Sequence, residues 1–389
     1  MLDYVLVGGN ICLEHEIITD SALIIKKGII DSICSEDTIN LKKYSNIIHL
    51  SHDNFIIPGF IDVHIHGANG SDVMDASLDG LKNISHSILK NGTTGFLATT
   101  MSEREERISN ALTSVNRFMN SPFSKEVDYS DIYGIHLEGP YLSELKAGAQ
   151  NPKYVKSSDI KQFDRWNELS GNMIKKVTVA PESDVDLTLI SHLNRKKINS
   201  SIGHTCCSSK DAWKVINAGV SSCTHMFNAM SGFDHRNPGA LLPVLMSDQI
   251  IAELIADEVH TSPEILDFAY RIKGANHIIL VTDAMSAQGY GDGVFKLGGQ
   301  SVIVKGNEAR LENGTLAGSV LSMNKALVNM LKNTNCSLLE VIKMTSSNPA
   351  NQIGVYDKVG SISLGKKANL VVLDKNFQIL DVHKSGIKI

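Results

Sequence analysis

The sequence has few of the features that mark a membrane, nucleic-acid-binding or disulfide-rich protein. No apolar run reaches the ~18 residues of a membrane-spanning helix, and the 37 basic residues form no cluster of the kind that binds nucleic acid. Only six cysteines occur, none in a CxxC pair, in a chain too long to need a disulfide framework. We therefore expect no membrane partner, no nucleic-acid partner and reduced thiols.

The N-terminal residues Met1 to Val5 lack the positive segment and the cleavage site of a secretory signal. Together with the reduced thiols, this predicts a cytoplasmic protein. Cys206 and Cys207 are adjacent and lie close to a histidine in the sequence, but we interpret them as small packing residues rather than as metal ligands.

What the chain does have is an ordinary globular composition, with 42% hydrophobic and 20% charged residues and a net charge of −5. Its 389 residues suffice for two domains or for one large barrel with an addition. Apolar runs at Ala22–Ile25 and Ile29–Ile33, around the turn Lys27-Gly28, predict a hairpin. Further runs of this kind are Tyr4–Val7, Asn46–Leu50, Gly360–Ile362, Asn369–Leu373 and Gln378–Val382. We therefore predict a small β-sandwich domain built from residues 1–54 and 352–389.

The middle of the chain alternates strand patterns with helical ones. The segments with the length and composition of strands are Ile61–His66, Gly95–Thr100, Ile132–Glu138, Lys176–Ala180, Asn199–Thr205, Ser222–Phe227, Ile251–Ala256 and Ile278–Asp283. Helices are expected at Leu78–Lys90, Glu103–Phe118, Pro263–Lys273 and Leu338–Ser346, and an inserted hairpin at Phe295–Leu311 with its turn at Lys305-Gly306-Asn307. Eight alternating units predict an α/β fold, a (β/α)8 TIM-like barrel, over residues 55–351.

Ligand-capable side chains gather at the C-terminal ends of these predicted strands, the face on which barrel enzymes place catalysis. His64 and His66 end the first strand, and because side chains alternate along a strand, both point to the same face. Two imidazoles on one face suit a divalent metal such as zinc or iron. An HxH pair alone is weak evidence, but here Pro58-Gly59 precedes an apolar strand that ends in the pair.

Further candidates lie at other strand ends. Glu138 precedes a Gly-Pro turn, His204 follows a glycine, and His225 lies in the sixth strand. Each alone is more often a structural residue than a ligand, but their positions at neighbouring strand ends favour a shared metal site. Asp283 ends the eighth strand, where its carboxylate could take a proton from a metal-activated water and pass it to a leaving amine. Without the cluster, a helix-capping role would be the simpler interpretation.

Taken in order, these motifs resemble those of the N-acetylglucosamine-6-phosphate deacetylases, a family of the amidohydrolase superfamily. The run from Pro58 to Gly67 is similar to the opening motif of the superfamily. The narrower match is carried by His136–Tyr141, Gly203-His204-Thr205, His225–Met230, Val281–Met285 and Leu316–Ser319. The resemblance covers essentially the whole chain, and it implies hydrolysis of the acetamide of an amino-sugar phosphate in amino-sugar catabolism or cell-wall sugar recycling.

The resemblance also implies which residues hold metal. Glu138, His204 and His225 would bind one divalent ion, while His64 and His66, with Glu138 bridging, would bind a second. Zinc, iron, manganese and cobalt all suit such ligands, so the identity of the metal and the choice between one and two ions per subunit stay open. Asp283 would be the catalytic residue that accepts a proton and returns it to the amine.

Substrate contacts follow from the same resemblance. Asn228 and Ala229 match residues near the sugar phosphate, and His260 matches a histidine that contacts the sugar. Arg236 resembles an arginine that reaches the phosphate across the interface of a homodimer, where a planar guanidinium suits a phosphate; a solvated loop arginine is the alternative. The remaining expected contacts are Ala149, Gln150, Leu316, Ala317 and Gly318.

Two places vary within the family. Some members carry Gln and Asn where this chain has His64 and His66, and some carry a histidine, thought to polarise the acetamide carbonyl, where this chain has Gln150. We therefore hypothesise that a second metal takes the polarising role here. The segment Asp257-Glu258-Val259 also departs from the Asp-Gly expected beside His260, which alters the expected sugar pocket.

Other interpretations compete with this one. A dihydroorotase or hydantoinase typically bridges two metals with a carboxylated lysine on a barrel strand, but here Glu138 takes that place and no lysine stands at a matching strand end. A non-catalytic scaffold of the same fold would have lost ligands or the strand-eight aspartate, and all of them are intact. The galactosamine and mannosamine analogues of the substrate stay open.

Overall fold

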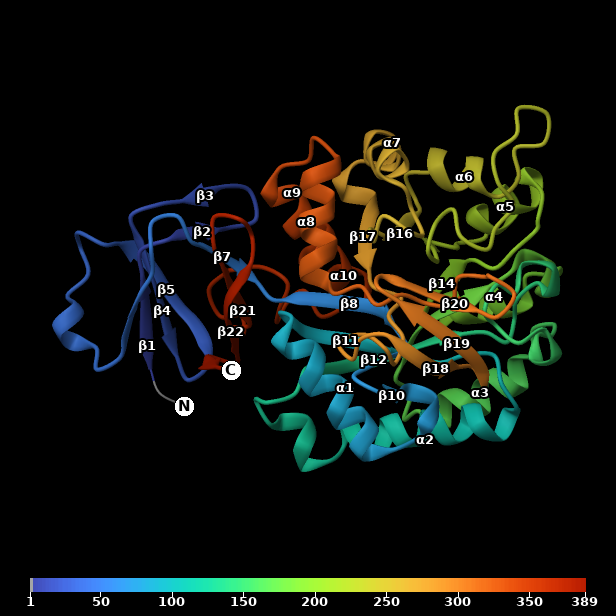
Figure 1. Cartoon of the computed structure of the whole chain (residues 1–389), viewed down its shortest axis with the longest axis horizontal. Helices are drawn as coiled ribbons and strands as arrows, with labels where there is room; N and C mark the ends of the chain where they lie inside the picture. Colours follow the sequence, from blue (N-terminus) through green and yellow to red (C-terminus); the bar gives the residue numbers. More distant parts are fainter. Residues whose placement is uncertain (1–2) are drawn as a thin grey trace.

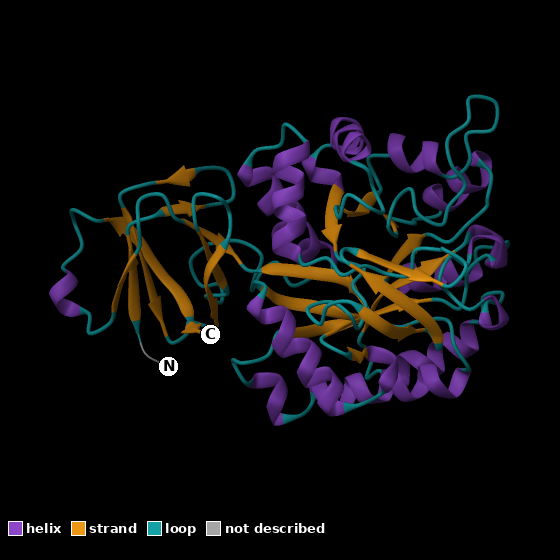
Figure 2. Cartoon of the chain, viewed as in Figure 1, coloured by secondary structure: helices purple, strands orange, loops and turns teal. Residues whose placement is uncertain are grey.

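The computed structural model describes residues 3–389, which form a barrel and, beside it, a smaller pair of β-sheets (Figure 1). Both ends of the chain, marked N and C, lie on the smaller part. Helices surround the strands of the larger part, whereas the smaller part is almost entirely strand and loop (Figure 2). None of the helices in residues 3–389 combines the length and the apolar composition that crossing a bilayer requires.

The larger part is built on eight parallel strands in the order β17-β16-β15-β14-β13-β12-β11-β8. Their bounds are β8 Phe60–Ile65, β11 Thr93–Thr99, β12 Asp131–Glu138, β13 Ile174–Val179, β14 Asn199–Ile202, β15 Ser222–Cys223, β16 Ile251–Ile255 and β17 Ile278–Val281. The barrel closes between the chain after β17 and β8, where the N–H of Asp283 donates to the carbonyl oxygen of His64 and the N–H of His66 donates to that of Ala284, both over 2.9 Å. The predicted (β/α)8 barrel is confirmed.

Two barrel strands end three or more residues before the sequence pattern predicted. β14 and β15 end at Ile202 and Cys223, although the pattern extended them to positions 205 and 227. The chain leaves the extended conformation because His204 and His225 have positive φ values of 46° and 31°. Residues other than glycine rarely adopt this left-handed conformation, so hydrophobic patterning continues a strand straight through it.

The α-helices in the described part of the chain are α1 Leu78–Lys90, α2 Glu105–Met119, α3 Ile160–Leu169, α4 Thr188–Arg195, α5 Ser209–Asn217, α6 Leu241–Met246, α7 Pro263–Lys273, α8 Met323–Asn333, α9 Leu338–Ile342 and α10 Asn348–Gln352. Helix α1 begins where the Ser77 side chain accepts the N–H of Gly80 over 3.2 Å. Its Leu81, Ile84 and Ile88 then bury one face. The predicted helix at 338–346 is interrupted, because α9 passes into a wider π-type turn before α10.

The smaller part contains a four-stranded sheet, β5-β4-β1-β6, and a six-stranded sheet, β23-β22-β21-β7-β2-β3. Their bounds are β1 Tyr4–Val7, β2 Asn10–Cys12, β3 Ile17–Ile18, β4 Ser21–Lys26, β5 Ile29–Ser35, β6 Ile47–His49, β7 Phe55–Pro58, β21 Leu370–Leu373, β22 Ile379–Lys384 and β23 Ile387–Lys388. The two ends of the chain meet in the second sheet, where β21 pairs with β7. Both sheets contribute side chains to one buried hydrophobic cluster, which includes Leu6, Leu23, Ile56 and Leu370.

Two details of the terminal region differ from the sequence pattern. Gly360–Ile362 forms an irregular loop instead of a strand, because Gly360 has a φ of 89°. Strand β7 pairs within the six-stranded sheet, and the first barrel strand begins at Phe60. The division into residues 1–54 plus 352–389 and residues 55–351 stays a prediction.

The insertion after the eighth barrel strand forms three strands, β18 Gly293–Leu297, β19 Gln300–Lys305 and β20 Glu308–Leu311. The predicted turn after Lys305 joins β19 to β20. A further turn at Gly298-Gly299, where both residues have positive φ, adds β18 to the predicted hairpin. A separate short ladder joins β9 Gly67–Ala68 to β10 Ser71–Asp72.

Candidate metal centre

Side chains from five barrel strands or the turns after them meet at the C-terminal mouth of the barrel. They are His64, His66, Glu138, His204, His225 and Asp283. Strand β8 supplies His64, the position directly after it supplies His66, and β12 supplies the glutamate, while the turns after β14, β15 and β17 supply the other three. All of them are buried, with exposed fractions between 0% and 8%. The barrel thus brings together ligand-capable residues that lie up to 219 positions apart, from 64 to 283.

The carboxylate of Glu138 lies at the centre of this cluster. Its Oε1 atom is 3.2 Å from Nε2 of His204 and 3.1 Å from Nε2 of His225. The same oxygen is 3.3 Å from Nε2 of His64, and Oε2 is 3.2 Å from Nε2 of His66. One carboxylate therefore lies close to all four imidazoles, so it could serve as a ligand to an ion held by either pair of histidines.

Asp283 faces His64 and His66. Its Oδ1 atom is 3.1 Å from Nε2 of His66 and 3.4 Å from Nε2 of His64. The cluster therefore divides into two groups of three buried residues whose ligand atoms lie within 4.8 Å of one another: Glu138, His204 and His225 in one, and His64, His66 and Asp283 in the other. Each group offers three ligands to one ion.

The orientation of the histidine rings fits a metal. Nδ1 of His204 donates to the carbonyl oxygen of Lys146 over 2.8 Å, and Nδ1 of His64 donates to Oε2 of Glu253 over 2.9 Å. Each ring therefore presents the lone pair of Nε2 to the cluster. The Nε2 atoms of His204 and His225 lie 3.0 Å apart, a distance that two facing lone pairs tolerate only with a cation or a proton between them. Imidazole nitrogens and carboxylate oxygens in this number suit a divalent transition metal.

The protonation states within the cluster are strongly shifted. Burial favours the neutral acid, but the surrounding imidazoles, led by His64, outweigh it and hold the pKa of Glu138 well below its ordinary value. Burial likewise lowers the pKa of an imidazole, but the carboxylates of Asp283 and Glu138 raise the pKa of His66 to about 9. Protons and a divalent ion therefore compete for the same nitrogens, and metal binding would release protons.

Backbone strain accompanies these positions. His204, His225 and Asp283 have φ values of 46°, 31° and 48°, in the left-handed region that costs a non-glycine residue about 1–3 kcal/mol. Each residue follows a barrel strand, and the change of direction aims its side chain at the cluster. Gly203 permits the turn at His204, because a Cβ atom there would lie 2.8 Å from Cβ of Thr224.

A pocket borders the cluster and contains most of the predicted substrate contacts, namely Ala149, Gln150, Asn228, Ala229, His260, Leu316 and Gly318. The imidazole of His260 is held by Asp257, whose Oδ2 lies 2.7 Å from Nδ1. The carboxamide of Gln150 donates to Oε2 of Glu138 over 2.7 Å and accepts the N–H of Ser102 over 2.6 Å. Both side chains are therefore fixed before any substrate arrives.

Within the described part of the chain, two of the predicted substrate contacts, Ala317 and Arg236, do not line this pocket. Ala317 is fully buried behind its neighbours. Arg236 is exposed in the loop between β15 and α6, which protrudes from the barrel at the upper right of Figure 1. Within its own chain Arg236 therefore does not line the pocket.

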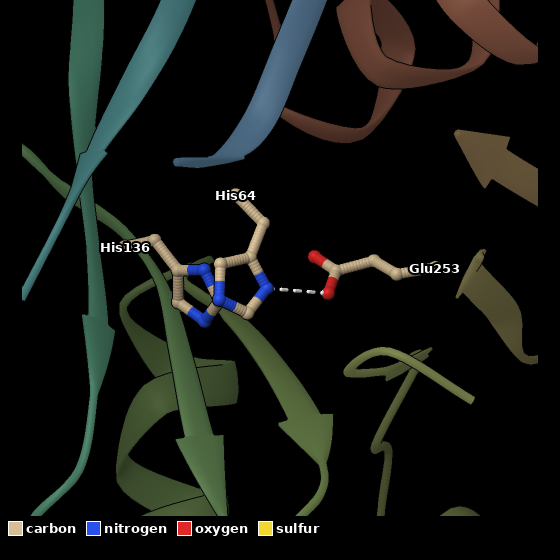
Figure 3. Close-up of side chains that lie close together, drawn as sticks. All are labelled: His64, His136 and Glu253. Atoms are coloured by element: carbon tan, nitrogen blue, oxygen red, sulfur yellow. Dashed lines mark hydrogen bonds and ion pairs between the residues drawn. The ribbon is translucent and has the colours of Figure 1, made fainter. Parts of the chain in front are cut away.

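A polar layer lies directly beneath the cluster, and of its members only His136 belongs to a motif that the sequence singles out. It consists of His136, Lys176 and Glu253, all fully buried. Figure 3 shows His136 and Glu253 flanking the ring of His64. Lys176 lies in the middle of β13 rather than at its end, and its ammonium is paired with Glu253. The available signal was a charged residue inside each of two apolar strands, β13 and β16.

The adjacent thiols lie outside the cluster. Cys207 is buried in the core, whereas Cys206 is exposed, and its Sγ atom lies 3.2 Å from Oε1 of Glu182. All six cysteines are unpaired. The structure therefore gives neither residue a place among the candidate ligands.

Comparison with known proteins agrees with this geometry. The model of the amidohydrolase family matches residues 55–388. The N-acetylglucosamine-6-phosphate deacetylase of Bacillus subtilis (strain 168) is 40% identical over 370 residues, which cover 95% of this chain and 93% of that protein. The N-acetylgalactosamine-6-phosphate deacetylase of Escherichia coli O157:H7 is 31% identical over 331 residues, covering 85% of this chain and 86% of that one.

Solved structures agree as well. The crystal structure of N-acetylglucosamine-6-phosphate deacetylase from Thermotoga maritima superposes with a TM-score of 0.87 at 31% identity, covering 99% of each chain. The D267A mutant of the Mycobacterium smegmatis deacetylase, solved with N-acetyl-D-glucosamine-6-phosphate, gives a TM-score of 0.92 at 26% identity, covering 100% of this chain and 99% of that one. With the barrel, the ligand cluster and these matches in agreement, the chain belongs to the amidohydrolase family, in the group that contains the N-acetylglucosamine-6-phosphate deacetylases.

Proposed function

We propose that this enzyme hydrolyses N-acetylglucosamine 6-phosphate to glucosamine 6-phosphate and acetate. The observation that carries the proposal is the meeting, at one pocket, of the two ligand groups, the carboxylate of Asp283 and the predicted sugar contacts. Relatives with that activity align along nearly the whole chain. The activity fits a role in amino-sugar catabolism or in the recycling of cell-wall sugars.

The ligand groups would hold one or two divalent ions. Glu138, His204 and His225 form one site, while His64 and His66, with Glu138 within reach of both, form the other. A divalent ion held by these residues would act as a Lewis acid and would lower the pKa of water, so that hydroxide, the nucleophile that attacks the amide, becomes available near neutral pH. Zinc, iron, manganese and cobalt all suit these ligands.

Asp283 is the proposed proton carrier of the reaction. Its Oδ1 atom lies at the boundary between the ligand cluster and the pocket, 3.1 Å from Nε2 of His66. Its neighbours keep the carboxylate ionised, because His64 and His66 lower the pKa of Asp283 against the effect of burial. An ionised carboxylate can take the proton of the attacking water and return it to the nitrogen of the sugar, which departs as a neutral amine.

The other pocket residues bind and orient the substrate. His260, fixed by Asp257, would contact the sugar, and Asn228 with Ala229 would lie near the phosphate. Gln150 occupies the place where the resemblance expects a histidine in some family members, and its amide donates to Glu138. We therefore propose that both ligand groups must be filled for full activity.

Two further proposals concern the context of the enzyme. Arg236 is exposed in its own subunit, so we propose a homodimer in which it reaches the phosphate in the neighbouring site. A phosphorylated sugar carries a charge that keeps it from crossing a bilayer freely, so we place the enzyme in the cytoplasm with its substrate.

The test is acetate release from N-acetylglucosamine 6-phosphate by metal-loaded protein, compared with the unphosphorylated sugar. We expect fast release only from the phosphorylated compound. The galactosamine analogue is the second candidate, because a relative 31% identical carries that activity in its name. Faster release from N-acetylgalactosamine 6-phosphate would transfer the assignment to it, and no release from either compound would refute both.

A further inference from the structure

Glu253 occupies a position from which it can serve both ligand groups at once. It lies on β16 with no exposed surface, and its carboxylate points at the ring of His64 (Figure 3). Its Oε2 atom accepts the Nδ1–H of His64 over 2.9 Å and also the backbone N–H of His225 over 3.1 Å. His64 belongs to one ligand group and His225 to the other. A single oxygen therefore contacts both groups from below.

The other oxygen of this carboxylate is also engaged. Oε1 accepts the ammonium of Lys176, a side chain on β13 that is itself completely buried. An unpaired carboxylate at this depth would be costly, and so would an unpaired ammonium, whereas the pair satisfies both. Lys176 thus lets an ionised glutamate lie beneath the metal centre while its second oxygen stays available to the histidines.

His64, His136 and Glu253 place potential ligand atoms close together, but they do not form another metal site. Nδ1 of His64 carries the proton that it donates to Glu253, so it has no lone pair to offer. Nε2 of His136 is engaged with the hydroxyl of Thr178 at 2.8 Å, so that His136 could offer only its Nδ1 atom, and one nitrogen beside an ion-paired carboxylate is too few ligands for an ion. The positive charge that such a site would need is already supplied by Lys176.

His136 also restricts the orientation of the His64 ring. The two rings meet edge to face, with centroids 4.6 Å apart and an interplanar angle of 77°. The ring of His64 is therefore fixed on one edge by a hydrogen bond and on its flank by packing. Its remaining nitrogen, Nε2, faces Glu138 and Asp283.

We propose that Glu253 is a positioning residue for the metal centre: its Oε2 atom fixes His64 in the tautomer that directs Nε2 to one ligand group and holds the left-handed backbone of His225 that directs its ring to the other. The inference rests on the metal requirement of the proposed function, but it concerns metal binding and needs no substrate. Hydrogen-bond partners of this kind, when removed, typically cost metal affinity about 10- to 100-fold.

Two double variants separate the effect of the hydrogen-bond acceptor at position 253 from the effect of the buried charge. In Lys176→Met with Glu253→Gln, the ion pair is gone, but a carbonyl oxygen can still accept from His64 and His225. In Lys176→Met with Glu253→Met, the volume is similar and the acceptor is absent. Neither leaves a buried charge unpaired, so both are expected to fold, which thermal unfolding of the chelator-treated proteins would verify. The two variants differ in whether an oxygen faces the two histidines.

The measurement is the affinity for zinc, by competition with a chelating indicator, together with the number of ions bound per chain. We expect the Met/Gln variant to stay within a few-fold of wild type. The Met/Met variant should lose about 10- to 100-fold in affinity at both sites. Wild-type affinity in the Met/Met variant would overturn the proposal, as would equal losses in the two variants. Catalytic failure of wild-type enzyme that binds metal normally would refute the proposed function and leave this inference standing.

Discussion

Asp283 and His64 are joined twice, once through the backbone and once through their side chains. The N–H of Asp283 donates to the carbonyl oxygen of His64 over 2.9 Å, and Oδ1 of Asp283 lies 3.4 Å from Nε2 of His64. The first contact closes the barrel, and the second brings the proposed proton carrier to the ligand cluster. The position of the reactive carboxylate is therefore set by the same seam that completes the fold.

Replacing Asp283 with asparagine should separate the role of this residue in proton transfer from its role in closing the barrel. The backbone hydrogen bond remains and the side-chain volume is nearly unchanged, so we expect a folded protein that keeps the ion held by Glu138, His204 and His225, a group to which Asp283 does not belong. The rate constant kcat should fall by about 100-fold or more, because general acid–base catalysis contributes 10²–10⁴-fold. Steady-state acetate release with metal analysis of the same sample measures this. An active variant would exclude Asp283 as the proton carrier.

His66 tests whether the two ligand groups bind separate ions. Its Nε2 atom contacts Glu138 and Asp283, but His66 belongs only to the group of His64, His66 and Asp283. The variant His66→Ala should therefore retain one ion per chain where the wild type binds two, as measured by elemental analysis after dialysis. The matched control is His260→Ala, which changes a pocket histidine outside both groups and should leave the metal count unchanged while raising KM. A single ion in fully active wild-type enzyme would contradict the two-ion proposal.

The stability of chelator-treated protein should depend on pH in a defined direction. The pKa of His66 is raised from 6.5 to about 9, so its protonated form stabilises the fold fully below pH 6.5, and this contribution is lost as the pH rises to about 9. Glu138 acts oppositely, because its lowered pKa gives a contribution that is present above 4.5 and lost in acid.

The melting temperature of the treated protein should therefore fall between pH 6.5 and 9. Metal-loaded protein should show a flatter profile over that window, because a metal ion replaces the proton. A profile that rises with pH in the treated protein would contradict this assignment, and His66→Asn should remove part of the decline.

Gly203 should be intolerant of a side chain. A Cβ atom there would meet Cβ of Thr224 at 2.8 Å and Cγ2 of Thr178 at 3.0 Å, inside the packed barrel. The variant Gly203→Ala should lower the free energy of unfolding by about 1–3 kcal/mol, the usual cost of overpacking, and should reduce metal retention by moving His204. Gly232→Ala is the matched control, since nothing lies within 4 Å of its Cβ position. Urea denaturation of both variants would decide, and equal stabilities would show that the barrel relaxes around the methyl group.

Arg236 offers a test of the homodimer. Arg236→Ala and Asp283→Asn subunits should each be poorly active alone. After subunit exchange, a mixed dimer contains one site with an intact Asp283 from one chain and an intact Arg236 from the other. We expect recovery to about a quarter of wild-type activity, since half of the dimers are mixed and each has one complete site. No recovery, with subunit exchange verified, would place Arg236 in its own subunit or outside the site.

The predictable parts of this molecule were those with local signals. The eight barrel strands were predicted because strand patterns alternate with helical patterns along the middle of the chain, and the six residues at the barrel mouth because barrel strands end at one face. The early ends of β14 and β15 were not predictable, because nothing in the residue type of His204 or His225 signals a left-handed backbone.

The layer beneath the cluster was missed for a different reason. Lys176 and Glu253 lie 77 positions apart and become partners only when β13 and β16 face each other across the barrel. A charged residue within an apolar strand is visible in a sequence, but its partner is not. The extra strand β18 was missed although its turn, Gly298-Gly299, was visible, because the pattern was interpreted as one hairpin.

The pairing of β21 with β7 has a consequence for folding during synthesis on the ribosome. Leu370 lies opposite Pro58, so the six-stranded sheet cannot be completed until more than three hundred further residues have been synthesised after β7. At roughly 5–20 residues per second, the ribosome leaves the edge of β7 unpaired for tens of seconds. An exposed strand edge of this kind can pair with other chains. The nascent chain is therefore open to such pairing until β21 emerges and covers this edge.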